Sequence, residues 1–123
     1  MRGRIDALSR AASTYPLLFC SKGGPLMLEN KFQAKLIKEL KTIFRGCIVM
    51  KNDSSYIQGI PDLMVLYNDK WASLECKKSS RASRQPNQEY YVGLMNEMSF
   101  SRFICPENKD EVIDELVSFF KSW

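Results

Sequence analysis

The sequence predicts an α/β sandwich built on a mixed four-stranded sheet, with elements in the order α-β-β-β-α-β-α. The first observation behind this prediction is that apolar residues at helical spacing alternate with short apolar, strand-like runs. The second is the length of 123 residues, which suits one domain with one core. The third is a composition of 45% hydrophobic and 26% charged residues, which is typical of a globular chain.

The N-terminal segment, residues 1–26, lacks sustained periodicity and ends in a Lys-Gly-Gly-Pro break. We interpret it as a flexible arm before a domain at 27–123, and Met27 could serve as an alternative start. The net charge of +4 comes mostly from this arm, which holds four basic side chains and one acidic side chain. Overall basicity is therefore weak evidence for nucleic-acid binding.

The first predicted helix runs from Leu28 to about Phe44 and ends at Gly46. Its apolar residues recur at spacings of three and four, with lysines on the other face. A short apolar strand at 47–50 and a polar loop at 51–59 follow.

The second half of the chain predicts a hairpin, then a helix, a strand and a closing helix. Pro86 suits the first turn of a helix. In order, the predicted elements are a strand at 60–67, a tight turn at 68–69, a strand at 71–77, a basic loop at 78–85, a helix at 86–98, a strand at 100–105 and a helix at 107–121.

Several classes of protein are excluded or disfavoured by residue types. Histidine is absent, which excludes Ser–His–Asp hydrolases, Cys–His proteases and histidine general-base mechanisms. No apolar run approaches the roughly 18 residues of a membrane span. We therefore expect a soluble, cytoplasmic protein. No CxxC pair is present, so the cysteines are expected to be free, reduced and buried: Cys20, Cys47, Cys76 and Cys105.

Three charged residues fall together on the predicted hairpin: Asp62 at the start of one strand, with Glu75 and Lys77 on its partner. Alternation along a strand points Glu75 and Lys77 to the same face. Neighbouring carboxylates repel each other unless a cation or proton neutralises them, and Mg²⁺ prefers such oxygens together with substrate phosphates. A nearby ammonium can position or deprotonate an attacking water, or stabilise a pentacoordinate phosphate.

A third carboxylate, Glu29, lies on the apolar stripe of the first predicted helix, where an apolar residue would be expected. The metal site is one plausible partner for it. A favourable interaction with the helix dipole is the alternative.

Glu in the first helix, Pro61-Asp62, and then Glu75-Cys76-Lys77 across a hairpin resemble the PD-(D/E)xK nuclease superfamily. The following loop and Gln88 resemble its small virus-type replication–repair nucleases and Holliday-junction-resolvase-like members, often phage-encoded. The resemblance covers about residues 27–120. It implies a restriction-endonuclease-like fold, Mg²⁺ as cofactor with Mn²⁺ as a substitute, no organic cofactor, and host cytoplasm if phage-encoded.

The resemblance also implies roles for individual residues. Asp62, Glu75 and the Cys76 backbone carbonyl would bind the metal, and Glu29 would be an outer or water-mediated ligand. Lys77 would be the catalytic lysine, and Gln88 would support the site. A salt-bridged surface without catalytic function is the alternative for these charges.

Basic side chains near this motif are candidates for phosphate contact: Lys51, Lys78, Arg81 and Arg84. A solvated charged face is the alternative reading. Ser54, Ser55 and Tyr56 could line the same groove, whereas packing is favoured for Trp71.

The favoured function is a Mg²⁺-dependent endonuclease acting on duplex or branched DNA, such as a four-way junction. Paired cuts would need a homodimer, because one small domain offers one site. Phe119, Phe120 and Trp123 are candidates for that contact. Two rivals remain: a non-catalytic branched-DNA-binding or recombination accessory protein with this fold, and a sequence-reading restriction-type enzyme.

Overall fold

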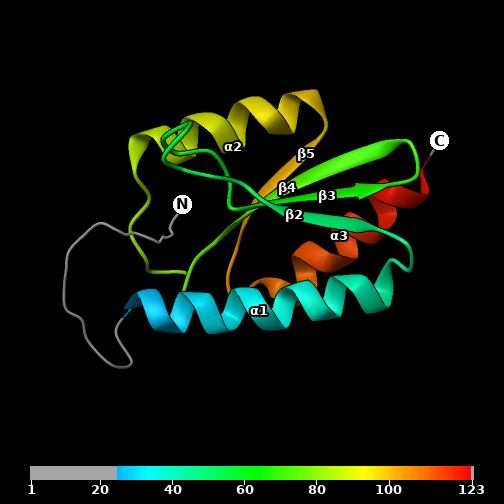
Figure 1. Ribbon diagram of the computed structural model, residues 1–123, viewed down its shortest axis with the longest axis horizontal. Coiled ribbons are helices and arrows are strands. Elements are labelled where there is room, and N and C mark those ends of the chain that lie inside the picture. The colour runs from blue at the N-terminus through cyan, green and yellow to red at the C-terminus, as the bar shows by residue number, and fades with distance from the viewer. Residues whose placement is uncertain (1–24, 123) are drawn as a thin grey trace.

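Three helices cover the two faces of a four-stranded sheet in residues 25–122, the part of the chain that the computed structural model describes (Figure 1). The predicted fold class and element order are confirmed. The elements are α1 (Pro25–Ile43), β2 (Ile48–Lys51), β3 (Leu63–Tyr67), β4 (Lys70–Cys76), α2 (Pro86–Met98), β5 (Phe100–Ile104) and α3 (Lys109–Lys121).

The sheet has the strand order β2-β3-β4-β5 and is mixed. β2, β3 and β4 pair antiparallel, whereas β5 pairs parallel to β4. The tight turn at 68–69 is confirmed, and Asn68 adopts φ 55° there, a left-handed conformation that asparagine tolerates. The parallel pair needs a crossover, and α2 supplies it.

The first helix starts earlier than predicted, at Pro25 rather than Leu28. Proline suits a first helical turn, since its missing N–H has no helical partner there. The predicted boundary at residue 26 therefore lies inside α1, while residues 1–24 of the expected arm are outside the described residues. Gly46 follows the helix with φ 91°, the left-handed conformation that commonly ends helices.

Strand β3 begins later than predicted, at Leu63 rather than Ile60. Pro61 cannot donate to a strand ladder. Asn52 instead holds this segment, since its backbone N–H donates to the Asp62 carbonyl and its side chain donates to the Pro61 carbonyl, both at 2.8 Å. The other predicted boundaries lie within two residues of those observed.

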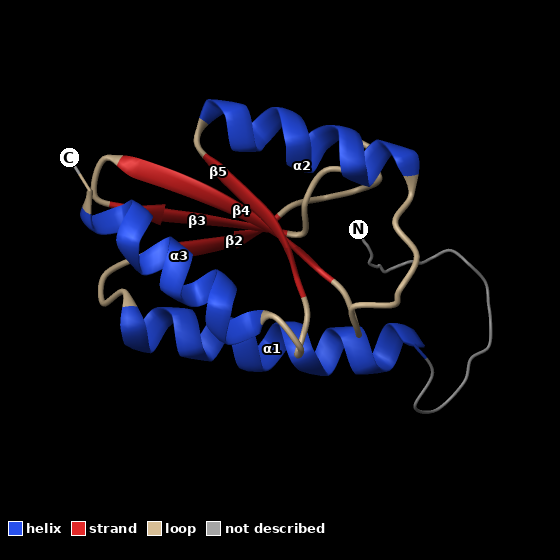
Figure 2. Cartoon of the chain, turned by 180° about the vertical axis from the view of Figure 1, so that it is seen from behind, coloured by secondary structure: helices blue, strands red, loops and turns tan. Residues whose placement is uncertain are grey.

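Helices α1 and α3 pack on one face of the sheet, and α2 packs on the other (Figures 1 and 2). The face toward α1 and α3 holds the apolar core. Its fully buried side chains are Leu36, Leu40, Leu63, Val65, Ala72, Leu74, Cys76, Ile104 and Leu116.

Phe120 was a predicted candidate for a dimer contact, and this prediction is wrong. Phe120 is 4% exposed, and its ring packs edge-on against Phe44 at 5.0 Å between centroids. Burial in the monomer core leaves it no surface for a second chain. Phe119 is also partly buried against the core, and Trp123 lies outside the described residues.

Three cysteines within the described residues are free, as predicted: Cys47, Cys76 and Cys105. Cys47 is only partly buried, which corrects the expectation of full burial; Cys20 lies outside the described residues.

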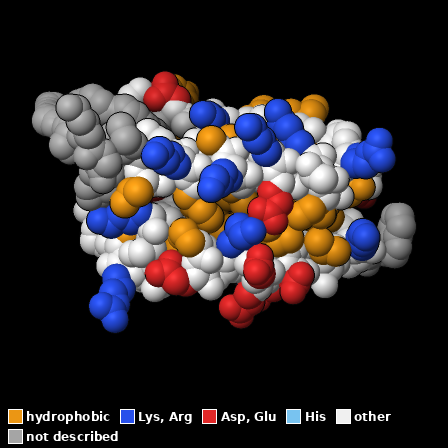
Figure 3. All heavy atoms as spheres, turned by 90° about the horizontal axis from the view of Figure 1, so that it is seen from below, with side chains coloured by type: hydrophobic (Ala, Val, Ile, Leu, Met, Phe, Trp, Pro, Cys, Tyr) orange, Lys and Arg blue, Asp and Glu red, His pale blue; other side chains and the backbone are white. Residues whose placement is uncertain are grey.

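Charge is segregated on the face formed by α1 and α3 (Figure 3). Exposed basic residues follow the outer side of α1, as the sequence predicted, while exposed acidic residues follow α3. The basic residues are Lys31, Lys35, Lys38, Lys41 and Arg45, and the acidic residues are Asp110, Glu111, Asp114 and Glu115. No helix within residues 25–122 has the length and hydropathy required to span a membrane.

Candidate active site at the end of strand β4

The β3–β4 hairpin brings Asp62 and Glu75 together. Leu63 pairs with Leu74, so Asp62 lies opposite Glu75 as the strands separate. Oδ2 of Asp62 accepts a hydrogen bond of 3.0 Å from the backbone N–H of Cys76. That bond fixes the Asp62 carboxylate against the end of β4, as the predicted motif requires.

Glu75 is buried although it is a carboxylate, with 3% of the residue exposed. Its Oε2 accepts a hydrogen bond of 3.0 Å from Nε2 of Gln88, while its Oε1 is buried and has no hydrogen-bond partner among residues 25–122. Burial, first of all, and then the charge of Asp62 raise the pKa of Glu75 well above its ordinary value, and Lys77 opposes them. Burial and the charge of Asp62 thus outweigh the compensation that the described residues give the ionised carboxylate.

Lys77 lies on the same side of the sheet as Glu75, as predicted. Its Nζ donates to Oε1 of Gln88 at 2.7 Å and lies 3.9 Å from Oε2 of Glu75. The side chain is 11% exposed, so its ammonium is held in place rather than free in solvent.

Gln88 connects the two charged groups from the first turn of α2. Its Oε1 also accepts the backbone N–H of Gln85 at 3.0 Å, which closes a capping box at the start of the helix. The start of α2 and the orientation of Glu75 and Lys77 therefore depend on one side chain.

Glu29 lies half-buried near the start of α1. Its charge contributes to the raised pKa values of Glu75 and Cys76, in both cases behind burial and Asp62. Within residues 25–122 no three His, Cys, Asp or Glu side chains form a group that could hold a metal. The role of Glu29 as an outer or water-mediated ligand therefore stays a prediction.

Gln33 is a neighbour of the site that the sequence did not reveal. Burial raises the pKa of the Cys76 thiol well above its ordinary value, and a hydrogen bond with the Gln33 side chain partly opposes this. Gln33 follows Glu29 by four residues, so both lie on one side of α1. The spacing of four residues between Glu29 and Gln33 was the sequence feature that could have identified Gln33.

The loop between β2 and β3 packs closely against the start of α2. Gly59 has φ 91°, and a Cβ there would lie 2.4 Å from Cβ of Asn87. Only glycine fits both the conformation and the contact. Ser54, Ser55 and Tyr56 belong to this loop, and Tyr56 is 85% exposed.

The predicted phosphate-contacting cations are not all on the site's face of the sheet. Lys51 pairs with Leu63, whose side chain enters the apolar core, so Lys51 lies on the face opposite Glu75. Lys78 is half-buried after β4, and Arg81 is exposed. The guanidinium of Arg84 lies over the ring of Phe103 at 4.0 Å from its centroid.

A divalent cation fits the donors that this site offers. Asp62 and Glu75 supply carboxylate oxygens, which hard cations such as Mg²⁺ prefer. Among the described residues Oε1 of Glu75 has no hydrogen-bond partner, and the pKa of Glu75 is raised, so positive charge would be favourable at this position. These observations, rather than the motif, support a cation site.

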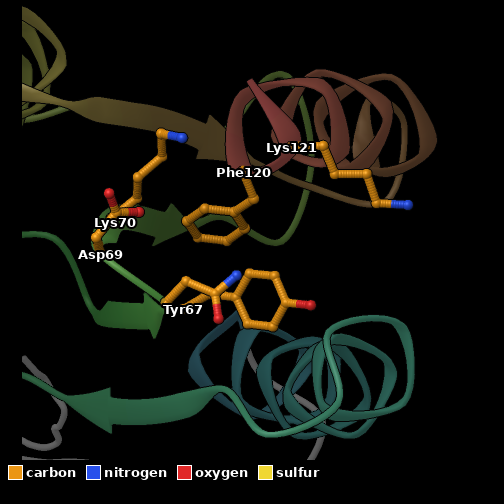
Figure 4. A pocket seen from close by; sticks show the side chains of 6 residues that line it. Tyr67, Asp69, Lys70, Phe120 and Lys121 are labelled. Atoms are coloured by element: carbon orange, nitrogen blue, oxygen red, sulfur yellow. The ribbon is translucent and has the colours of Figure 1, made fainter. Parts of the chain in front are cut away.

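A second feature, a pocket of about 350 Å³, lies at the hairpin turn of the sheet (Figure 4). Tyr67 and Phe120 form its apolar part, with ring centroids 5.4 Å apart. It is also lined by Asn68, Asp69, Lys70 and Lys121. The pocket is at the opposite end of β4 from Glu75 and takes no part in the candidate site.

No family model, curated protein or solved structure matches this chain. The resemblance to PD-(D/E)xK nucleases therefore depends on the motif residues alone.

Proposed function

We propose that this chain is a metal-dependent endonuclease that hydrolyses phosphodiester bonds in DNA. The observation that carries the proposal is the buried Glu75 carboxylate beside Asp62. One of its oxygens has no hydrogen-bond partner among the described residues, and the other shares Gln88 with Lys77. A surface ion pair would not need burial or an amide that bridges both charges.

Asp62, Glu75 and the Cys76 backbone carbonyl would hold Mg²⁺, or Mn²⁺ in its place, with Glu29 as an outer or water-mediated ligand. A bound divalent cation supplies Lewis-acid polarisation of the phosphate and a more acidic water. Lys77 places a fixed positive charge beside Glu75, where it can orient the attacking water and balance the charge developing on the phosphate. Gln88 holds the Lys77 ammonium in that position.

Branched DNA, such as a four-way junction, is the proposed substrate by resemblance to the small resolvase-like members of the superfamily. Two cuts in one junction would require two copies of the chain, since each offers one site. The proposed compartment is the cytoplasm, or the host cytoplasm for a phage protein.

The test is cleavage of supercoiled plasmid and a synthetic four-way junction in Mg²⁺, Mn²⁺ or EDTA. Lys77→Met keeps side-chain length without the charge, and Lys109→Met is the matched control, because Lys109 pairs with Glu39 at 2.8 Å away from the site. We expect metal-dependent cleavage by wild type and Lys109→Met but not by Lys77→Met. Junction binding without cleavage in any metal would instead establish a non-catalytic DNA-binding protein, and one defined plasmid cut would indicate a restriction-type enzyme.

A further inference from the structure

Two arginines stack on phenylalanines of β5, and their surroundings differ. Arg102 lies over Phe100 at 4.2 Å from the ring centroid, and its Nε donates to Glu115 at 3.0 Å. Arg84 lies over Phe103 at 4.0 Å but forms no hydrogen bond or ion pair with any residue of 25–122. Within residues 25–122, a carboxylate therefore neutralises the guanidinium of Arg102 but not that of Arg84.

The unneutralised guanidinium lies on the face of the sheet that carries the candidate site. Phe103 is the register partner of Glu75 on the neighbouring parallel strand, so both side chains point to the same face. Phe100 pairs with Ala72 and points to the apolar face instead. Arg84 is therefore held above the immediate neighbour of Glu75.

The loop that carries Arg84 is anchored around it. The Ser80 backbone N–H donates to Oε1 of Glu107 at 3.2 Å. Gln85, the next residue after Arg84, caps α2 through Gln88, the same side chain that holds Glu75 and Lys77. Arg84 is thus positioned both by its contact with the Phe103 ring and by the capped start of α2 that follows it.

A guanidinium stacked on a ring keeps its N–H donors at the rim, where they match two oxygens of a phosphate. We propose that Arg84 binds the DNA phosphate next to the scissile one, and that Phe103 is a positioning residue that holds Arg84 for this contact. The inference rests on the proposed nuclease function and assigns the phosphate subsite to Arg84 among the three cations of the loop.

The test is binding of the full chain to a short fluorescent DNA duplex, measured by anisotropy over a series of salt concentrations at fixed Ca²⁺. For Arg84→Gln we expect affinity to fall about tenfold and the slope of log K against log salt to lose about 0.9, the loss of one phosphate contact. Arg102→Gln is the matched control, because it removes an equally stacked but neutralised arginine, and it should leave the slope unchanged. Phe103→Leu should weaken binding in the same direction, and Phe103→Tyr should restore it.

An Arg84→Gln variant with the slope and affinity of wild type would overturn the inference, as would equal losses in Arg84→Gln and Arg102→Gln. Failure of wild type to bind DNA would overturn it too. Cleavage assays on the same proteins separate this from the proposed function. Metal-dependent cleavage with no effect of Arg84→Gln on binding leaves the nuclease standing without this subsite, whereas Arg84-dependent binding without cleavage supports the subsite and removes the nuclease.

Discussion

Strand β4 buries both of its faces, and the two faces differ in chemistry. Toward α1 and α3 it presents Ala72, Leu74 and Cys76, each 0% exposed. Toward α2 it presents Ser73 and Glu75, which are 0% and 3% exposed. The first face gains free energy of folding by removing apolar surface from water. The second face must provide a hydrogen-bond partner for every polar atom it buries.

The polar face meets that requirement at Ser73, whose hydroxyl binds the hydroxyl of Ser101 at 2.7 Å. It does not meet it at Glu75, whose Oε1 has no hydrogen-bond partner in the described part of the chain. An uncompensated buried carboxylate is costly in folding free energy, and this cost supports the proposal that Glu75 binds a cation. The comparison teaches that one face of β4 stabilises the fold, whereas the other buries charge at a cost and holds the proposed site.

The largest expected effect is a loss of cleavage caused by a substitution on the polar face. Asp62→Asn should lower the plasmid cleavage rate about 10³-fold or more, since it removes a metal-binding charge while keeping the shape. Circular dichroism should show an unchanged fold. Ser73→Ala, on the same face and fully buried, should cleave at nearly the wild-type rate; an equal loss in both variants would mean that the face responds only to packing.

The next largest effect is a loss of stability caused by a substitution on the apolar face. Leu74→Ala should lower the free energy of unfolding by about 2–5 kcal/mol, because it leaves a cavity at a fully buried position between Ser73 and Glu75. Urea denaturation measures this, and cleavage per folded molecule should hardly change. Loss of cleavage greater than the loss of folded protein would show that the two faces are not separable.

A smaller effect is expected where α2 meets the polar face. Gln88→Ala should lower cleavage about 10–100-fold, because it frees both Glu75 and Lys77 from their shared partner. Asn87→Ala changes the adjacent residue and keeps the Cβ that packs against Gly59, so it serves as the control. Single-turnover rates of the two variants should differ clearly, and similar rates would remove Gln88 from the site.

The smallest effect is the pH dependence of stability in EDTA. Burial and Asp62 raise the folded-state pKa of Glu75 above the ordinary value of 4.5. Glu75 therefore stabilises the fold most when protonated, below about pH 4.5, and this contribution is lost as pH rises through the folded-state pKa. Glu75→Gln cannot ionise, so its stability advantage over wild type in urea denaturation should grow as pH rises above about 4.5 and level off above the folded-state pKa of Glu75. The difference should vanish near pH 4, and a constant difference at all pH values would contradict the raised pKa.

The fold was largely predictable because each element carries its own local signal. Periodicity in α1 and α3, the Asn68–Asp69 turn and Pro86 at the start of α2 are short-range features. The start of β3 was predicted incorrectly because Asn52, nine residues before Pro61, takes over the hydrogen bonds of that segment. Such a contact between loop segments produces no periodic pattern in the sequence.

The candidate site was predictable in part for the same reason. Alternation along β4 places Glu75 and Lys77 together, and the hairpin adds Asp62. Burial of Glu75 was not readable from the sequence, because it depends on α2 covering β4 from a later part of the chain. The stacking of Arg84 on Phe103 likewise joins a loop to a strand 19 positions away.

The most direct test of the account is thermal unfolding of wild type and Glu75→Gln with increasing Mg²⁺ or Mn²⁺ at constant ionic strength. A cation held by Glu75 and Asp62 should add about 2.7 kcal/mol at 100 times its Kd, which is roughly 10 °C in Tm for a domain of this size. We expect that shift in wild type and its loss in Glu75→Gln. A wild-type Tm unaffected by either metal, or equal shifts in both proteins, would contradict the claim that the polar face of β4 is a cation site.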